Sequence, residues 1–109
     1  MVILGLKNCD TCRKAKKALE TAELRDVRDT PLTSEERARL VAHFGEDILN
    51  KRSKTWRDLD EAARALAPDT LLAQSPTVMK RPVIDGPAGL TLGWSDVIKA
   101  RHLGTGGAG

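Results

Sequence analysis

Two cysteines separated by two residues are the side chains of this sequence best suited to chemistry. Cys9 and Cys12 are the only cysteines in the 109 residues, and they form a single Cys-x-x-Cys. The pattern places Cys9 between a buried strand and the first turn of a helix, where free backbone N–H groups and the helix dipole favour a thiolate. A thiolate is the nucleophile of thiol–disulfide exchange, and Cys12, about one helical turn further on, can resolve a mixed disulfide.

Other uses of the cysteine pair are less consistent with the sequence. A structural disulfide is disfavoured in a cytosolic protein. A zinc site would need two further ligands, and His43 and His102 lack the paired spacing of zinc ligands. The remaining alternative is two ordinary thiols, and Cys12 suits that passive role better because burial within the helix would raise its pKa. We predict a redox or catalytic thiol site with Cys9 as the nucleophile.

Composition and charge exclude several classes of protein. The chain is 40% apolar and 30% charged, and its formal charge is +3, with the two signs mixed along the sequence. That is a weak nucleic-acid signal, and the basic run at 13–17 is expected to form a solvated helix face. The early apolar run at 2–6 is too short for a signal peptide, and no stretch approaches the ~20 residues of a membrane helix. The sequence therefore predicts a cytoplasmic protein that binds neither membranes nor nucleic acid directly.

The elements around the cysteines are predicted from hydrophobic spacing. An apolar run at 2–6 predicts a buried strand, and a helical pattern begins at Asp10 and continues as far as Ala22. Residues 24–27 predict a short edge strand. Thr33 and Glu36 have capping-box spacing at the start of a helix that Gly45 interrupts. A further helix is expected from 56 to 66, ended by Pro68, with a short helical turn at 69–73.

The C-terminal part has the pattern of a hairpin followed by a helix. An extended segment is expected between Pro76 and Pro82, followed by strands at 82–85 and 90–92 around a turn. Ser95 is a candidate N-cap for a last helix, near whose end His102 would be favoured as a cation. Trp94 is expected in the core. Together the elements predict one mixed-sheet α/β domain over 1–103, with a flexible tail at 104–109.

Four motifs in order along nearly the whole chain carry a resemblance to a known family. They are Gly5–Thr11 followed by Lys14-Ala15, then Leu49–Leu59, Ser75–Pro82 and Leu92–Asp96. Together they strongly resemble the arsenate-reductase-like family, which includes the ArsC, Spx and YffB proteins. The resemblance implies a thioredoxin-like fold with an inserted helical region.

The resemblance also implies roles for individual residues. Cys9 takes the position of the family's redox cysteine, and Pro82 takes that of a proline in the cis form close to the site. A guanidinium near Cys9 would stabilise its thiolate and a bound anion. The residues assigned to substrate binding are the motif neighbours Asn8 and Thr11 and the two expected anion-binding arginines, Arg52 and Arg81.

Differences within the family separate the possible functions. Arsenate reductases of the family carry a third anion-binding arginine after the last strand, where this chain has Gly93–Asp96, so arsenate reduction is disfavoured. The sequence Asn8-Cys9-Asp10-Thr11 resembles that of the YffB branch of the family. This resemblance implies a thiol reductase that uses glutathione or glutaredoxin as electron donor and has no bound cofactor. Cys12 completes the pair of Spx-type regulators, which implies the alternative of a Cys9–Cys12 redox switch with RNA polymerase as partner.

Overall fold

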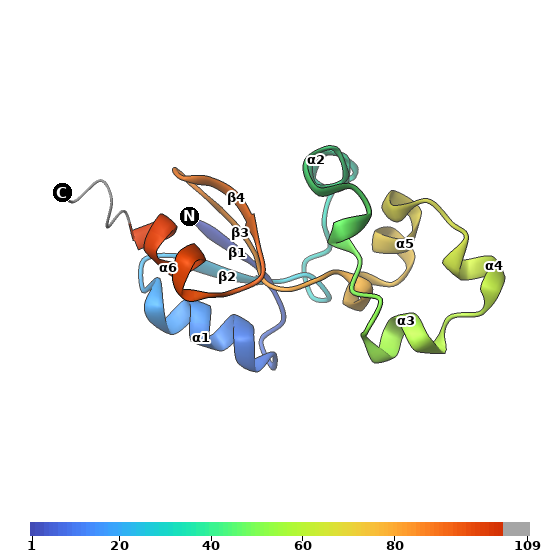
Figure 1. Cartoon of the computed structure of the whole chain (residues 1–109), viewed down its shortest axis with the longest axis horizontal. Coiled ribbons are helices and arrows are strands. Elements are labelled where there is room, and N and C mark those ends of the chain that lie inside the picture. The colour runs from blue at the N-terminus through green and yellow to red at the C-terminus, as the bar shows by residue number, and fades with distance from the viewer. Residues whose placement is uncertain (104–109) are drawn as a thin grey trace. The chain divides into compact units, whose positions relative to one another are not determined.

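The computed structural model describes residues 1–103, which divide into two compact units (Figure 1). The first unit combines residues 1–26 with those from 81 onward, and the second contains residues 27–80. The first carries the sheet and the second is helical, as an inserted helical region requires. The tail predicted at 104–109 lies outside the described residues, and the single domain expected over 1–103 stays a prediction.

The first unit is built on a four-stranded mixed sheet. Its strands are β1 (Val2–Gly5), β2 (Glu23–Asp26), β3 (Val83–Gly86) and β4 (Gly89–Leu92), in the order β2-β1-β3-β4. β2 runs parallel to β1 and forms one edge, as predicted, whereas β3 pairs antiparallel with both β1 and β4. The hairpin predicted near the C-terminus is therefore confirmed.

Two helices, α1 (Asp10–Ala18) and α6 (Asp96–Leu103), pack on one face of this sheet (Figure 1). Ile3 and Ile84 are opposite each other in the register and fully buried beneath them. Trp94 and Ile98 pack against the same cluster, which confirms the predicted place of Trp94 in the core. The buried cluster consists of Ile3, Ala15, Leu19, Ala22 and Ile84.

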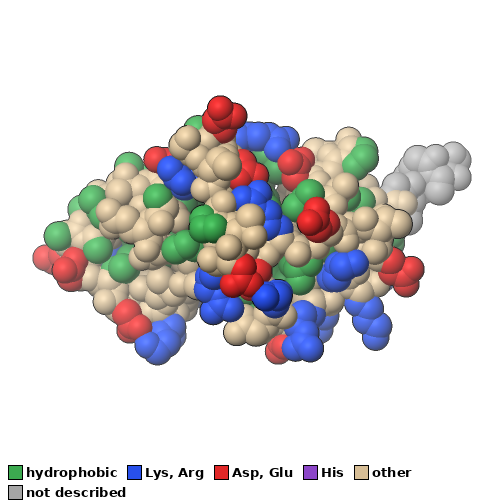
Figure 2. Space-filling model, turned by 180° about the vertical axis from the view of Figure 1, so that it is seen from behind, with side chains coloured by type: hydrophobic (Ala, Val, Ile, Leu, Met, Phe, Trp, Pro, Cys, Tyr) green, Lys and Arg blue, Asp and Glu red, His purple; other side chains and the backbone are tan. Residues whose placement is uncertain are grey.

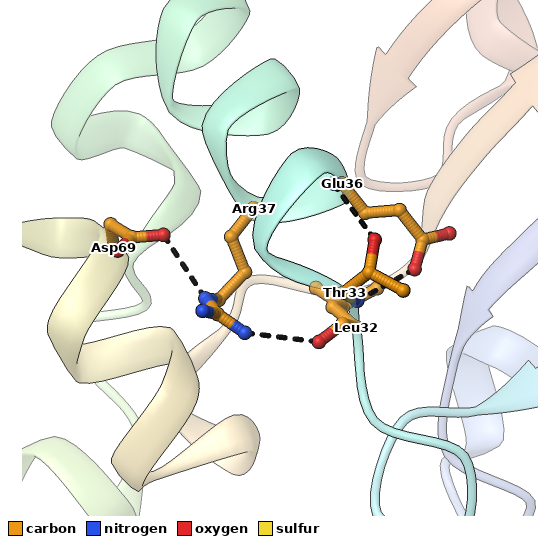
Figure 3. A network of polar contacts seen from close by, with 5 residues as sticks. All are labelled: Leu32, Thr33, Glu36, Arg37 and Asp69. Atoms are coloured by element: carbon orange, nitrogen blue, oxygen red, sulfur yellow. Dashed lines mark hydrogen bonds and ion pairs between the residues drawn. The ribbon is translucent and has the colours of Figure 1, made fainter.

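The second unit consists of short helices. They are α2 (Ser34–Phe44), the 3₁₀ helix η1 (Gly45–Ile48), α3 (Lys54–Asp58), α4 (Glu61–Arg64), α5 (Pro68–Gln74) and the 3₁₀ helix η2 (Pro76–Val78). The capping box at the start of α2 is confirmed: Thr33 Oγ1 accepts from the Glu36 N–H, and the Thr33 N–H donates to Glu36 Oε1 (Figure 3). Arg37 joins α2 to α5 through a 3.0 Å ion pair with Asp69 (Figure 3).

Some predicted helix boundaries are wrong. α1 ends at Ala18 rather than Ala22, because the backbone leaves the helical conformation at Leu19, with φ −106° and ψ 69°. The helix predicted from 56 to 66 is divided into α3 and α4. Leu59 is extended, and the Asp60 side chain accepts a hydrogen bond from the Ala63 N–H to begin a new helix.

Two prolines begin helical turns, one where a helical turn was predicted and one where it was not. The helical turn predicted at 69–73 is confirmed as α5, which begins one residue earlier, at Pro68. Pro76, by contrast, opens η2 in a segment expected to be extended. Proline suits a first helical turn because its fixed φ is helical and its missing N–H would have no partner there.

His102 is buried rather than a cation at a helix end. Only 8% of its surface is exposed, and its Nε2 lies 2.6 Å from Thr91 Oγ1. Its Nδ1 is buried beside Met1 and Gly86 and has no hydrogen-bond partner within residues 1–103. Burial, with a smaller contribution from Arg101, lowers the pKa of His102 below its ordinary value. The expectation of a dipole-stabilised imidazolium is therefore wrong, because desolvation outweighs the helix dipole.

This burial predicts how stability depends on pH. Since the pKa of His102 is lower in the folded chain than the ordinary 6.5, the unfolded chain binds the proton more tightly. The free energy of unfolding should therefore fall as pH decreases below about 6.5. Urea unfolding of the protein and of His102→Gln, measured from pH 5 to 8, isolates this contribution, and identical pH profiles for the two would contradict it.

Candidate active site

Cys9 lies at the end of the loop that connects β1 to α1, immediately before the first residue of the helix. Its backbone is extended, with φ −90° and ψ 121°, and it occupies the N-cap position of α1. The Cys9 N–H donates to Leu6 O at 3.2 Å and the Cys9 carbonyl accepts from the Arg13 N–H at 2.9 Å, so the turn is fixed on both sides. The side chain is half-buried, which leaves the sulfur accessible to a substrate.

Gly5, at the end of β1, provides the space that Cys12 occupies. Cys12 is fully buried, and a Cβ added at Gly5 would collide with its Sγ and lie 3.2 Å from its Cβ. Gly5 does not have positive φ, so close packing rather than backbone conformation requires glycine here. Gly5 belongs to one of the family motifs, but its role could not be predicted, because spacing along the chain does not show which helix residue faces a glycine.

Asp26, at the end of β2, supports the loop that leads to Cys9. It is 6% exposed, and its Oδ2 accepts a 3.0 Å hydrogen bond from the Lys7 N–H. This bond ties the β1–α1 loop to the neighbouring strand. This role of Asp26 could not be predicted from the sequence either, because an acidic residue on an edge strand is ordinarily solvated.

The two thiols occupy contrasting electrostatic environments. Partial burial by itself would raise the pKa of Cys9, but the Cys12 thiol and N–H and the Arg81 guanidinium approach its sulfur as donors and lower that pKa overall. The Cys9 side chain makes no capping hydrogen bond within the described chain. Burial, together with the charge of the Cys9 thiolate, raises the pKa of Cys12 to about 12. The site therefore favours a thiolate at Cys9 beside a neutral thiol at Cys12.

Arg81 comes to this site from the segment just before β3. Its positive charge lowers the pKa of both thiols, so its guanidinium lies near the pair. The following Arg81–Pro82 peptide bond is cis, and Pro82 is buried, with its carbonyl accepting from the Gly93 N–H at 2.8 Å. Cys9, Cys12, Arg81 and Pro82 thus all belong to the first unit.

The other predicted site residues are exposed. Asn8 lies in the loop before Cys9, and Thr11 lies in the first turn of α1. Arg52 belongs to the second unit, in the turn before α3, where its N–H donates to Asn50 Oδ1 at 3.0 Å. Substrate binding by these three residues stays a prediction.

Residues 1–103 contain neither a candidate metal centre nor a candidate membrane span. No three or more histidine, cysteine or acidic side chains are placed there to hold a metal ion together. Nor does that part of the chain contain a helix with the length and apolar character needed to span a membrane.

Comparison with known proteins identifies the family. The ArsC family model matches residues 4–98, so the chain belongs to the ArsC family. The solved structure of a protein named YFFB matches with a TM-score of 0.84 and 30% identity, covering 94% of this chain and 97% of that one. The predicted α/β, thioredoxin-like fold with an inserted helical region is therefore confirmed.

Two proteins with similar sequences are an uncharacterized protein and a transcriptional regulator. An uncharacterized protein of Haemophilus influenzae is 40% identical over 99 residues, covering 81% of this chain and 87% of that protein. The global transcriptional regulator Spx of Streptococcus pneumoniae is 27% identical over 107 residues, covering 88% of this chain and 80% of that protein.

Substituting Gly5 tests whether the position of Cys12 controls Cys9. In Gly5→Ala the added methyl displaces Cys12, so we expect a loss of about 1–3 kcal/mol of stability from overpacking and a rise in the pKa of Cys9. Urea unfolding and the pH dependence of Cys9 alkylation measure the two effects.

A second substitution provides the control. Cys12→Ala removes the sulfur that the new methyl would meet, so Gly5→Ala should cost less stability in that background. Equal costs in both backgrounds would show that the Gly5–Cys12 contact is not the cause.

Proposed function

We propose that this protein is a thiol oxidoreductase in which Cys9 is the nucleophile and glutathione or a glutaredoxin is the electron donor. The observation that carries the proposal is the pairing of a half-exposed thiol of lowered pKa with a buried thiol of raised pKa. A lowered pKa supplies the thiolate at neutral pH, and exposure lets a substrate sulfur approach it. Membership of the ArsC family supports the proposal.

The reaction begins with thiol–disulfide exchange at Cys9. Its thiolate attacks one sulfur of a substrate disulfide, forming a mixed disulfide while the other sulfur leaves as a thiolate. Cys12 then loses its proton and attacks the Cys9 sulfur, which releases the second substrate thiolate and leaves a Cys9–Cys12 disulfide. Two glutathione thiols, or one reduced glutaredoxin dithiol, return the pair to the reduced state and are themselves oxidised to a disulfide.

The order of these steps follows from the coupling of the two thiols. While Cys9 is a thiolate, its charge helps to hold Cys12 protonated. Once Cys9 is in a mixed disulfide, that charge is gone and the pKa of Cys12 falls, although burial still opposes ionisation. Cys12 is thus activated after the substrate is bound covalently rather than before.

Alkylation of each cysteine as a function of pH tests the proposal directly. With iodoacetamide and mass spectrometry of the reduced protein, Cys9 should react with a midpoint below the ordinary ~8.5 for a thiol, whereas Cys12 should stay slow across the neutral range. Equal reactivity with ordinary midpoints would rule out a prepared nucleophile. Cys9→Ser should reduce the turnover of a glutathione-coupled disulfide reductase assay to background.

Two substitutions at Cys12 separate its two roles. Cys12→Ser keeps an O–H donor beside Cys9 but cannot resolve a mixed disulfide, whereas Cys12→Ala removes both functions. We expect the pKa of Cys9 to rise more in Cys12→Ala than in Cys12→Ser, and both variants to accumulate the mixed disulfide. If the mixed disulfide resolves at the unsubstituted rate, the resolving role of Cys12 is wrong.

A redox-switched regulator that binds RNA polymerase is the second candidate. The observation that favours it is the likeness to Spx, together with the Cys9–Cys12 pair. In this alternative the pair sets the binding state and reduces no substrate.

A binding experiment distinguishes the regulator from the enzyme. Immobilised protein, either reduced or oxidised to the disulfide, is incubated with purified bacterial RNA polymerase, and Cys9→Ser/Cys12→Ser serves as a control locked in the reduced form. The regulator requires capture in one redox state and not the other. No capture in either state would remove this alternative.

A further inference from the structure

A basic groove lies between α1 and α6 in the first unit, apart from the thiol pair. It has a volume of about 360 Å³ and is lined by Lys14, Lys17 and Ala18 of α1, by Trp94 of the connecting loop, and by Asp96 and Lys99 of α6. All three lysines are exposed. Three ammonium groups and one carboxylate line the groove, so its net charge is positive.

The lysine ammonium groups of this groove do not pair with other side chains of the described residues. Among residues 1–103 no ion pair or side-chain hydrogen bond is made by Lys14, Lys17 or Lys99. By contrast, Lys16 on the same helix donates from its Nζ to Glu20 O at 2.9 Å. The groove lysines are therefore available to a ligand.

The walls of the groove are fixed before any ligand arrives. Trp94 packs against the core cluster beneath both helices. The start of α6 is fixed by the Ser95 side chain, which accepts from the Ile98 N–H at 3.2 Å, and by the Lys99 N–H, which donates to Ser95 O at 2.8 Å. A preformed site loses less conformational entropy on binding than a mobile one.

The combination of lysines and one half-buried indole indicates the chemistry of the occupant. Ammonium groups attract carboxylates, and the indole face offers apolar contact. A nucleic acid would need a continuous basic stripe for successive phosphates. Here Asp96 interrupts the basic groove. The face of the protein drawn in Figure 2 likewise carries acidic side chains among basic ones.

The groove begins on the same helix as the nucleophile. Lys14 follows Cys9 by five positions, which is roughly 7.5 Å along an α-helix axis. Five helical positions also turn the chain by about 140° around the axis, so an extended peptide, at roughly 3.3 Å per residue, needs at least three residues to connect the two places along the helix surface. We propose that the groove binds an acidic segment of a polypeptide substrate and thereby presents a nearby cysteine of that substrate to Cys9. This inference rests on the proposed function and names its substrate class.

Paired peptide disulfides test the inference. One synthetic peptide carries a central cysteine with glutamates about three residues away on each side, and its partner carries glutamines at those places. Each cysteine is joined by a disulfide to 2-nitro-5-thiobenzoate. Attack of the Cys9 thiolate on the peptide sulfur forms the protein–peptide disulfide and expels the coloured thiolate, whose absorbance gives the rate.

At low salt the acidic peptide should react roughly tenfold faster than the neutral one. The difference should close in 0.5 M NaCl and in Lys17→Glu and Lys99→Glu. It should persist in Lys16→Glu, which changes the protein's charge equally on the same helix but outside the groove. Equal rates for the two peptides, or an equal effect of Lys16→Glu, would overturn the inference.

Two controls separate this inference from its alternatives. The neutral peptide should react with the native protein and not with Cys9→Ser, so the proposed function can stand even where the groove inference fails. A single-stranded oligothymidine is added at matched ionic strength. Selective suppression of the acidic-peptide rate by that oligonucleotide would assign the groove to nucleic acid instead and overturn the inference.

Discussion

The close approach of α1 to β1, where Cys12 packs against Gly5, is the constraint on which the candidate site depends. A side chain at position 5 would occupy the space of the Cys12 sulfur, so the glycine fixes how near the helix can come to the strand. Ala15, fully buried one turn later, continues the same tight seam. Because the helix is held this closely, its N-terminus meets the end of the strand after a short loop, and Cys9 is left half-exposed at the N-cap. The loop itself is tied to β2 by the Asp26–Lys7 hydrogen bond.

This packing gives two chemically identical side chains unequal properties. Burial keeps Cys12 protonated, and a protonated thiol is a donor that stabilises the thiolate beside it. The thiolate in turn keeps Cys12 protonated, so each thiol holds the other in its state. The neighbouring Arg81 charge lowers both pKa values, yet desolvation still dominates at Cys12. In the proposed reaction, exposure therefore decides which cysteine attacks first, and the charge of Cys9 decides when Cys12 becomes reactive.

The sequence predicted features that depend on local chemistry. The capping box of Thr33 and Glu36 and the edge position of β2 were recovered because each follows from residues close together in the chain. Features that depend on distant partners were missed. Spacing could not show that Gly5 faces Cys12, that Asp26 meets the Lys7 N–H, or that His102 is buried beside Thr91. Pro76 was misread because a proline that suits an extended segment is equally compatible with the first turn of a helix.

The number of cationic donors near Cys9 affects which substrates the site can bind. A tetrahedral oxyanion such as arsenate carries more than one negative charge and needs several charge-assisted donors to leave water. Within the first unit Arg81 supplies a guanidinium to the thiol pair, and the stretch after β4 contributes Trp94 and Asp96 rather than an arginine. A disulfide carries no charge, so its approach to the thiolate requires no further cations. What the transition state needs is dispersal of the charge that moves from the attacking to the leaving sulfur, and one guanidinium with a neighbouring thiol meets that need. Arg81 and the Cys12 thiol are thus donors that suit the disulfide exchange proposed at Cys9.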